Sequence, residues 1–169
     1  MDHQLRRKRL AARLPEIGVE ALLVTRLPNV RYLSGFTGSN GQLVVTADGS
    51  VFFTDGRYAE QSRHEVPDLE RVVYMDGFPA TVFEACARLG LERVGFESAG
   101  VTYRLYEDLS AKAGDVSLSP VGEEVERLRW VKEPEELRLI DAAQEATDAG
   151  FDAILPKLRE GVTEKDLAL

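Results

Sequence analysis

The chain has 169 residues, of which 44% are hydrophobic and 30% are charged, a composition typical of a folded globular domain and unlike that of disordered or fibrous chains. Its formal net charge of -8 repels phosphate backbones and anionic lipids, which argues against nucleic acid and membranes as partners. One cysteine excludes an internal disulfide and fits a reducing, cytoplasmic compartment, and no apolar stretch reaches the roughly 18 residues of a membrane span.

The first segment of the chain predicts an amphipathic helix, because its apolar residues recur at helical spacing. The basic run Arg6–Arg9, with Arg13, lies on the same segment, and we expect it to be a solvated face of that helix. The apolar run Ala21–Thr25 is typical of a buried strand, and Pro28 with Asn29 predicts a turn. The apolar residues of the first segment are Leu5, Leu10, Leu14 and Ile17.

The middle of the chain predicts an α/β fold with a mixed sheet. Gln42–Thr46 and Val51–Thr54 are β-branched runs, and the Asp-Gly pair between them predicts an antiparallel hairpin. Helical and strand-like patterns then alternate, which indicates strand-helix units with a largely parallel portion beside the hairpin. Helices are expected at 57–65, 78–89 and 102–111, the last with Thr102 as N-cap, and strands at 71–75, 93–96 and 116–118.

The last part of the chain predicts a helical segment. A helix is expected at 123–131, and Pro134 begins a second one with an apolar stripe from Leu137 to Leu158. Because an exposed stripe is unfavourable, we expect it to fold back on the domain or to mediate self-association. Thr163 predicts a further capped helix, too short to bury anything, so we expect the natural protein to continue past Leu169.

Few side chains suit catalysis or metal binding. We expect His3 on a frayed terminus and His64 at a surface helix end. Cys86 lies among apolar residues at helical spacing, which predicts a buried structural thiol. Asp55 and Glu97 both end predicted strands, where functional groups of α/β folds gather, so a paired-carboxylate metal site stays open as an alternative.

Three glycines recur every three residues, at Gly35, Gly38 and Gly41, a spacing that could indicate a phosphate-binding loop. The following segment is strand-like, whereas a phosphate loop opens onto a helix, and the lysine of such loops is absent. We therefore predict a tight backbone turn that holds Phe36 at a surface.

Three ordered stretches carry a family resemblance: NVRYLSGFTG at 29–38, FTDGRY at 53–58 and LRWVKEPEE at 128–136. Together they resemble the creatinase/prolidase N-terminal domain and the start of the catalytic domain of Xaa-Pro aminopeptidases and dipeptidases. The resemblance implies a ribonuclease-H-like α/β domain at 1–131, followed at 132–169 by the linker and first helices of a pita-bread catalytic domain. It implies no catalytic and no metal-binding residue in this chain, since two divalent metal ions, Mn, Co or Zn, would bind in the catalytic domain beyond Leu169.

The resemblance also implies what such a domain does. It would narrow a cleft for proline-containing peptides, contribute to a homodimer and pair with its own C-terminal catalytic domain. The implied substrate-binding candidates are Phe36 and Thr37 on the glycine turn, and Arg57 and Tyr58 after the hairpin. An aromatic ring could cover proline and an arginine could bind a peptide carboxylate, but Arg57 and Tyr58 equally suit the first turn of a structural helix.

Other functions stay open. Related domains occur outside peptidases, so the chain could be a non-enzymatic peptide- or protein-binding module, or the N-terminal domain of a creatinase-like amidinohydrolase. A nuclease is suggested only by the ribonuclease-H-like topology, and the negative charge opposes it.

Overall fold

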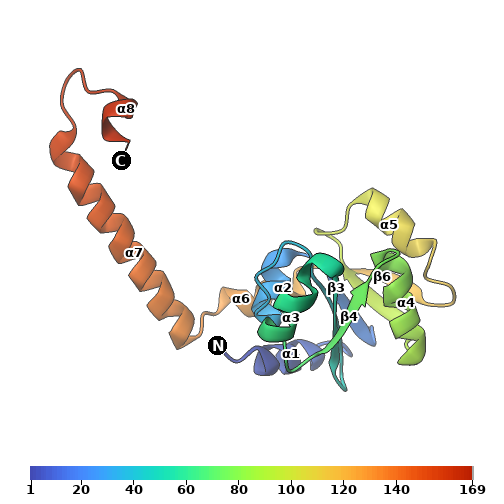
Figure 1. The fold of residues 1–169 in the computed structure, drawn as a ribbon. Helices are drawn as coiled ribbons and strands as arrows, with labels where there is room; N and C mark the ends of the chain where they lie inside the picture. Colours follow the sequence, from blue (N-terminus) through green and yellow to red (C-terminus); the bar gives the residue numbers. More distant parts are fainter. Residues whose placement is uncertain (169) are drawn as a thin grey trace. The chain divides into compact units, whose positions relative to one another are not determined.

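The computed structural model describes residues 1–168 and divides into two compact units, which are described separately. The larger unit is Asp2–Trp130, and the smaller comprises Met1 and the chain from Val131 onward. Figure 1 colours both units in chain order and labels many of their elements.

The larger unit is built on a six-stranded sheet with the order β4-β3-β2-β1-β5-β6. Strand β2 runs antiparallel to both of its neighbours, while the other pairs are parallel, which confirms the predicted α/β fold with a mixed sheet and a β2–β3 hairpin. The strands are β1 (Ala21–Val24), β2 (Gln42–Thr46), β3 (Ser50–Asp55), β4 (Glu70–Tyr74), β5 (Arg93–Glu97) and β6 (Ser117–Val121).

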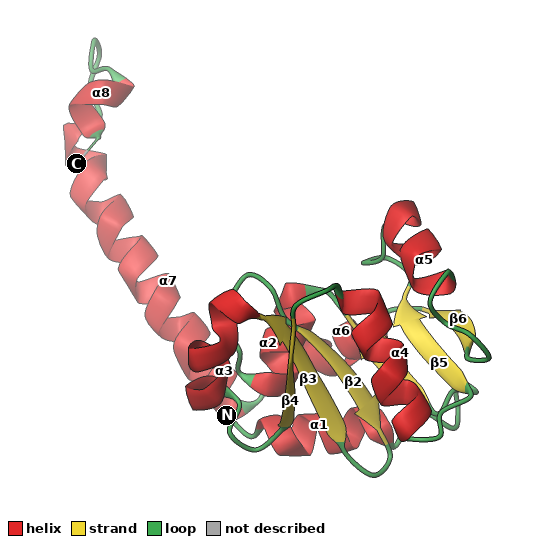
Figure 2. Ribbon diagram, turned by 45° about the vertical axis from the view of Figure 1, so that its right-hand side comes forward, coloured by secondary structure: helices red, strands yellow, loops and turns green. Residues whose placement is uncertain are grey.

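Helices cover both faces of this sheet (Figure 2). Helices α1, α2 and α6 pack on one face, and α4 and α5 pack on the other. Strand residues alternate between the two cores, so that Leu22 and Val24 face the first and Leu23 faces the second. The helices are α1 (His3–Ala11), α2 (Leu27–Ser34), the 3-10 turn η1 (Gly56–Tyr58), α3 (Ala59–Glu65), α4 (Phe78–Arg88), α5 (Tyr103–Ser110) and α6 (Glu124–Trp130).

The prediction of a turn at Pro28 and Asn29 is wrong, because both residues lie in the first turn of helix α2. A proline in the first helical turn lacks only an N–H that has no partner within the helix anyway. The helix ends at Gly35, whose φ of 84° is the left-handed conformation that glycine adopts without strain.

The basic face of α1 is only partly solvated, which corrects the prediction for Arg6 and Arg7. Arg6 is 1% exposed, lies 4.0 Å from the centre of the Tyr32 ring and donates from Nη1 to the Tyr32 carbonyl. Arg7 donates to the Leu33 carbonyl at 2.8 Å and forms an ion pair with Asp68. These carbonyls end helix α2, where cations are stabilising.

His3 is also not at a frayed terminus, since α1 begins at this residue. Its Nδ1 donates to the same Tyr32 carbonyl at 2.9 Å, and its side chain lies close to Gly35. The start of the chain therefore folds against the end of helix α2.

The smaller unit contains α7 (Pro134–Ile154), the 3-10 turn η2 (Leu155–Lys157) and α8 (Glu164–Leu167). Pro134 begins α7 and Thr163 caps α8, both as predicted. The apolar stripe is shorter than predicted, because α7 ends at Ile154 and Leu158 lies beyond it. Folding back or self-association of this stripe stays a prediction.

Among residues 1–168 no helix combines the length and apolar character needed to cross a bilayer.

Candidate functional site

Polar side chains gather at one edge of the sheet, which we call the carboxyl edge. It is the edge where β1, β3, β4, β5 and β6 end and where the antiparallel strand β2 begins. Ligands of open α/β sheets bind outside the carboxyl ends of strands, so this edge is the candidate site.

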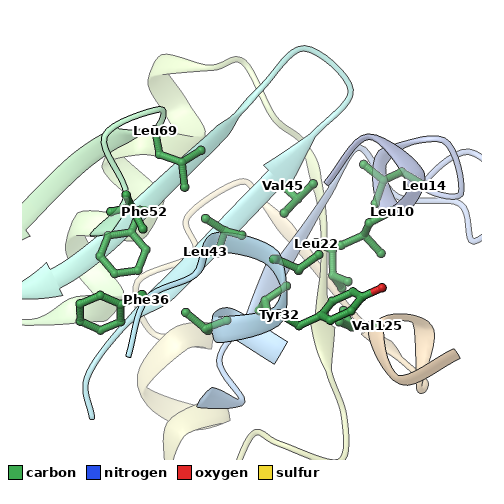
Figure 3. Close-up of a cluster of buried hydrophobic side chains, with 14 of the residues drawn as sticks. Leu10, Leu14, Leu22, Tyr32, Phe36, Leu43, Val45, Phe52, Leu69 and Val125 are labelled. Atoms are coloured by element: carbon green, nitrogen blue, oxygen red, sulfur yellow. The ribbon is translucent and has the colours of Figure 1, made fainter. Parts of the chain in front are cut away.

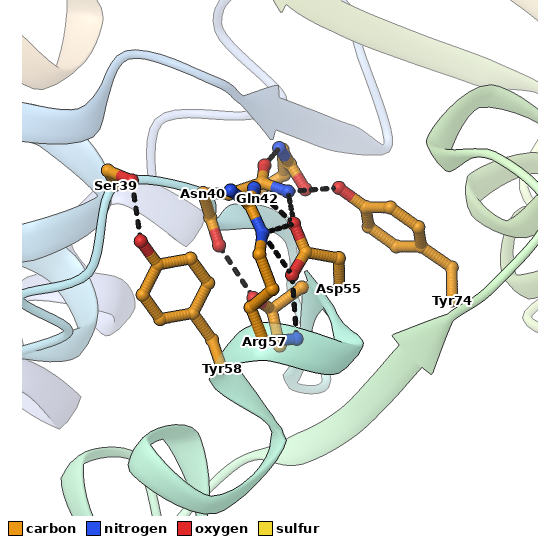
Figure 4. A network of polar contacts seen from close by, with 8 residues as sticks. Ser39, Asn40, Gln42, Asp55, Arg57, Tyr58 and Tyr74 are labelled. Atoms are coloured by element: carbon orange, nitrogen blue, oxygen red, sulfur yellow. Dashed lines mark hydrogen bonds and ion pairs between the residues drawn. The ribbon is translucent and has the colours of Figure 1, made fainter.

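Asp55 is the centre of a polar network at the ends of β3 and β4 (Figure 4). Its carboxylate accepts from Arg57 Nη2 at 2.7 Å and from the Arg57 backbone N–H at 2.9 Å, which caps the turn η1. Asn40 donates from Nδ2 to Asp55 and to the Tyr74 hydroxyl at 2.8 Å, and Gln42 donates to Asn40 Oδ1 at 2.7 Å. The antiparallel hairpin brings Asn40 beside Asp55, since β2 begins where β3 ends.

Asp55 and Arg57 form an ion pair at the surface. The hydrogen bond from Arg57, followed by that from Asn40, holds the pKa of Asp55 well below its usual range. The Arg57 side chain is 72% exposed, and its Nη1 makes no hydrogen bond within residues 2–130. Arg57 therefore combines a fixed position with an N–H pair open to an anionic ligand.

Tyr58 lies beside this ion pair and extends the network to Ser39. The two hydroxyl groups are 2.6 Å apart, and this hydrogen bond is the largest cause of a lowered Tyr58 pKa. The Arg57 guanidinium carbon lies 5.5 Å from the centre of the Tyr58 ring. The ring of Tyr58 also packs edge-on against Phe36, with 5.6 Å between centres.

The prediction that Phe36 is held at a surface is wrong. Phe36 is 1% exposed and packs against Phe52, with 4.8 Å between ring centres (Figure 3). A Cβ on Gly38 would lie 2.4 Å from the Phe36 ring, and one on Gly41 would lie 2.8 Å from it. These two glycines let the backbone pass directly over the ring, so the turn buries Phe36.

Thr37 is exposed but is fastened to helix α3 by Glu65. Its backbone N–H and its hydroxyl donate to the two carboxylate oxygens of Glu65, each at 2.7 Å, and Gln61 Nε2 donates to the Thr37 hydroxyl at 3.0 Å. Partial burial raises the pKa of Glu65, but the hydrogen bonds from Thr37 and Gln61 outweigh it and leave the pKa lowered. The loop is thus held on both sides, by Glu65 and by Tyr58.

Glu97 forms a second, buried network at the other half of the carboxyl edge. Its side chain is 3% exposed and accepts from the backbone N–H groups of Thr25 at 2.7 Å and Arg26 at 2.8 Å. Asn29 Nδ2 donates to it at 2.6 Å. Burial raises the pKa of Glu97, against the opposing effect of these hydrogen bonds.

The same network reaches helix α6. Asn29 Nδ2 also donates to Glu126 at 2.7 Å, and Asn29 Oδ1 accepts from Arg129 at 2.9 Å. Arg26 forms an ion pair with Glu126. The single side chain of Asn29 therefore ties α6 to the ends of β1 and β5.

The alternative of a carboxylate pair at Asp55 and Glu97 is wrong. Strands β2 and β1 lie between β3 and β5, which separates the two residues by three strand spacings, or roughly 14 Å. No group of three or more His, Cys, Asp or Glu residues within 1–168 is arranged to hold a metal ion.

The histidine and cysteine at the remaining candidate positions have the predicted surroundings. His64 lies at the exposed end of α3, 3.0 Å from Glu60. Cys86 is fully buried in α4, and burial raises the pKa of its thiol to about 11.

Sequence reasoning selected the turn from Phe36 to Ser39, with Arg57 and Tyr58, but it missed the neighbouring partners Asn40, Glu65 and Tyr74. The missed signal was the hairpin itself, because an antiparallel pair places the residues before its first strand beside those after its second. Whether any of these residues contacts a substrate stays a prediction.

Comparison with known proteins identifies the family. The family model of the creatinase/prolidase N-terminal domain matches residues 6–131. The chain belongs to this family. Within the creatinase/prolidase N-terminal domain family, it is 36% identical over 149 residues to the uncharacterized peptidase YqhT of Bacillus subtilis, covering 88% of this chain and 42% of that protein.

Solved structures of family members have the same fold. The Xaa-Pro dipeptidase from Bacillus anthracis superposes with a TM-score of 0.93 at 29% identity, covering 98% of this chain and 46% of that one. The N-terminal domain of the cytoplasmic peptidase PepQ from Mycobacterium tuberculosis superposes with a TM-score of 0.69 at 37% identity, covering 73% of this chain and 98% of that domain. The chain spans less than half the length of the curated relatives it matches.

Proposed function

We propose that this chain is the non-catalytic N-terminal domain of a metal-dependent Xaa-Pro aminopeptidase or dipeptidase, which removes residues that precede proline. The observation that carries the proposal is the family match over residues 6–131, together with relatives that are peptidases of about twice this length or more. In this proposal the chain works with a C-terminal catalytic domain, in a cytoplasmic enzyme that forms a homodimer. The name of the M. tuberculosis relative, a cytoplasmic peptidase, supports the compartment.

The two divalent metal ions, Mn, Co or Zn, belong to the catalytic domain in this proposal. There they would activate a water molecule and stabilise the negative charge that develops on the carbonyl oxygen. No residue of this chain takes part in that step. The N-terminal domain contributes the shape and charge of the cleft.

The exposed residues of the carboxyl edge are the part of this domain best suited to face a peptide. Arg57 presents Nη1 to solvent while Asp55 holds the rest of its guanidinium in place, so it can bind the carboxylate of a short peptide without losing its position. Tyr58 and Thr37 add hydroxyl groups on either side of a fixed loop. The buried ring of Phe36 packs against the Tyr58 ring and holds it in position.

Hydrolysis of a short peptide with proline in second position, assayed with Mn²⁺, tests the proposal. This chain is compared with the same chain extended through the catalytic domain that we propose. Activity only in the extended protein supports the division of roles. Activity in the chain alone would contradict it, and inactivity in both would favour a binding module.

The contribution of Arg57 is tested in the extended protein. Loss of one charge-assisted hydrogen bond costs about 1.5–3 kcal/mol, so Arg57→Ala is expected to lower kcat/KM roughly 10- to 100-fold, mainly through KM. Arg104→Ala is the matched control, because Arg104 is an exposed arginine on α5 with no ion pair within residues 2–130. Equal kcat/KM values for the two variants would contradict a role for Arg57 in substrate binding.

The same assays distinguish the other candidate functions. Creatine as substrate tests a creatinase-like amidinohydrolase, and calorimetric titration of this chain with a proline-containing peptide tests a binding module. Metal-dependent cleavage of RNA or DNA tests the nuclease, which no arrangement of metal-binding residues within 1–168 favours.

A further inference from the structure

A hollow of about 460 Å³ lies at the amino edge of the sheet, opposite the carboxyl edge. It is bounded by three turns: the one that follows α1, the one between β2 and β3, and the one between α4 and β5. Figure 2 shows the β2–β3 turn at the bottom of the sheet. We call this cavity the amino-edge hollow. Its size is within the range of ligand pockets, and none of the residues described at the carboxyl edge lines it.

Two glycine turns fix the walls of the amino-edge hollow. In the first, Gly18 has a φ of 75° and the Val19 N–H donates to the Leu14 carbonyl at 3.1 Å. In the second, Gly90 has a φ of 68° and the Leu91 N–H donates to the carbonyl five residues earlier at 3.0 Å. Each glycine N–H also bonds to a carbonyl three residues earlier, which is the pattern of a helix-ending Schellman turn. The walls are therefore formed before any ligand binds.

The surface of the hollow is largely apolar. Leu14 and Val19 are buried and form its floor, while Leu89 is 42% exposed at its rim. Pro15 and Ala47 are also exposed at the rim. A preformed hollow with apolar groups left in water suits an apolar ligand group.

The charge around the hollow is negative. Three charged residues line it, and the Arg93 guanidinium lies 3.3 Å from the Glu20 carboxylate, with which it pairs. The Glu92 backbone N–H, and then that of Arg93, lower the pKa of Glu20 by donating to it at 2.8 and 3.0 Å, so Glu20 stays ionised. The Asp48 carboxylate has no ion-pair partner among residues 1–168. Helix α4 also ends beside the hollow, and the carboxyl end of a helix favours a cation.

We propose that the amino-edge hollow binds a segment of a partner protein in which an aliphatic residue is followed by lysine or arginine. The aliphatic side chain enters between Leu14 and Leu89, and the cation next to it pairs with Asp48 at the rim. This interaction goes beyond the function proposed above and does not depend on it.

A nuclear magnetic resonance titration of the isotope-labelled chain tests this interaction. The probe is acetyl-Gly-Leu-Lys-Gly-amide, and we expect its saturable shifts at the backbone N–H groups of Ala47, Leu89 and Leu91. Replacing its leucine by glycine should weaken binding roughly 10- to 100-fold, because the buried aliphatic group is lost. Replacing its lysine by glutamate should weaken binding about 5-fold or more. The probe contains no proline, so it does not resemble a substrate of the proposed peptidase.

Variants of exposed residues test the position without disturbing the core. Ala47→Trp fills the hollow and should weaken binding about 10-fold or more, whereas Ala111→Trp, at an exposed alanine that does not line it, should not. Asp48→Asn should weaken binding roughly 2- to 5-fold, and Asp108→Asn on the exposed side of α5 is its matched control. Each variant is checked for an unchanged circular dichroism spectrum and melting temperature.

Several results would overturn the proposal. They are the absence of saturable shifts at millimolar probe, equal binding of the lysine and glutamate probes, and unchanged binding by Ala47→Trp. Shifts of Ala47 and Leu89 on dilution of the chain alone would assign the hollow to a second copy instead. Peptide hydrolysis is not part of these measurements, so failure of this interaction is distinguishable from failure of the proposed function.

Discussion

Replacing Phe36 by alanine should reveal whether this residue is part of the core or part of a surface loop. Phe36 is 1% exposed and contacts Phe52 and Tyr58 through ring pairs with centres 4.8 and 5.6 Å apart. Phe-to-Ala changes in cores cost about 3–5 kcal/mol, because transfer free energy is lost and a cavity remains. The two ring contacts favour the upper half of that range, so we expect a loss of about 4 kcal/mol in the free energy of unfolding.

The assay is equilibrium unfolding of the full chain in urea, followed by far-ultraviolet circular dichroism. Tyr103→Ala is the matched control, because Tyr103 is an aromatic residue that is 75% exposed. Its substitution should change the free energy of unfolding by no more than about 0.5 kcal/mol. Phe36→Leu, which retains much of the apolar volume, should fall between the two.

A loss below about 1 kcal/mol for Phe36→Ala, with an unchanged slope of free energy against urea, would refute the reasoning. That value is expected for a ring on a surface turn, which is where the glycine spacing alone had suggested that Phe36 lies.

Further predictions concern the turn, the ion pair and the thiol. Gly38→Ala should destabilise the fold by about 1–3 kcal/mol, because its Cβ would meet the Phe36 ring at 2.4 Å, whereas Gly49→Ala, with open space around it, should change the melting temperature little. Since the folded-state pKa of Asp55 is depressed, its ion pair contributes stability above the pKa of an unfolded aspartate, and this stability is lost as pH falls toward the lower folded value; Asp55→Asn should flatten that acid limb in melting curves recorded across pH. Cys86, buried and with a thiol pKa of about 11, should resist a thiol reagent at pH 8 in the native protein and react on unfolding, and rapid native labelling would contradict its burial.

Local sequence signals predicted the elements of this fold well. The Asp-Gly pair produced the β2–β3 hairpin, and the alternating patterns produced the strands and helices that follow it. Thr102 accepts from the Leu105 backbone N–H at 3.2 Å as the predicted N-cap of α5. These signals depend only on residues a few positions apart, so they can be recognised in a single sequence without knowledge of how the elements pack.

Apart from the turn predicted at Pro28 and Asn29 and the length of the α7 stripe, the errors concern contacts between residues far apart in the sequence. The basic residues around Arg6 predict a solvated side chain. In the structure Arg6 is buried against the ring and carbonyl of Tyr32, which lies 26 residues away in the sequence. Phe36 resembles a loop aromatic, but the hairpin places Phe52 beneath it. Neither partner can be found by helical or strand periodicity, since both depend on how the elements pack.

Most residues of the stretch NVRYLSGFTG with a visible role stabilise the fold. Asn29 joins Glu97 to α6, Gly35 ends helix α2, and Phe36 fills the core beneath the glycine turn. Because these roles belong to the fold, the stretch supports membership of the family strongly. It says little about which substrate the protein binds. The exposed and fixed side chain of Arg57 makes no comparable contribution to the core. A test of function should therefore begin with Arg57, since its substitution can change substrate binding without first unfolding the domain.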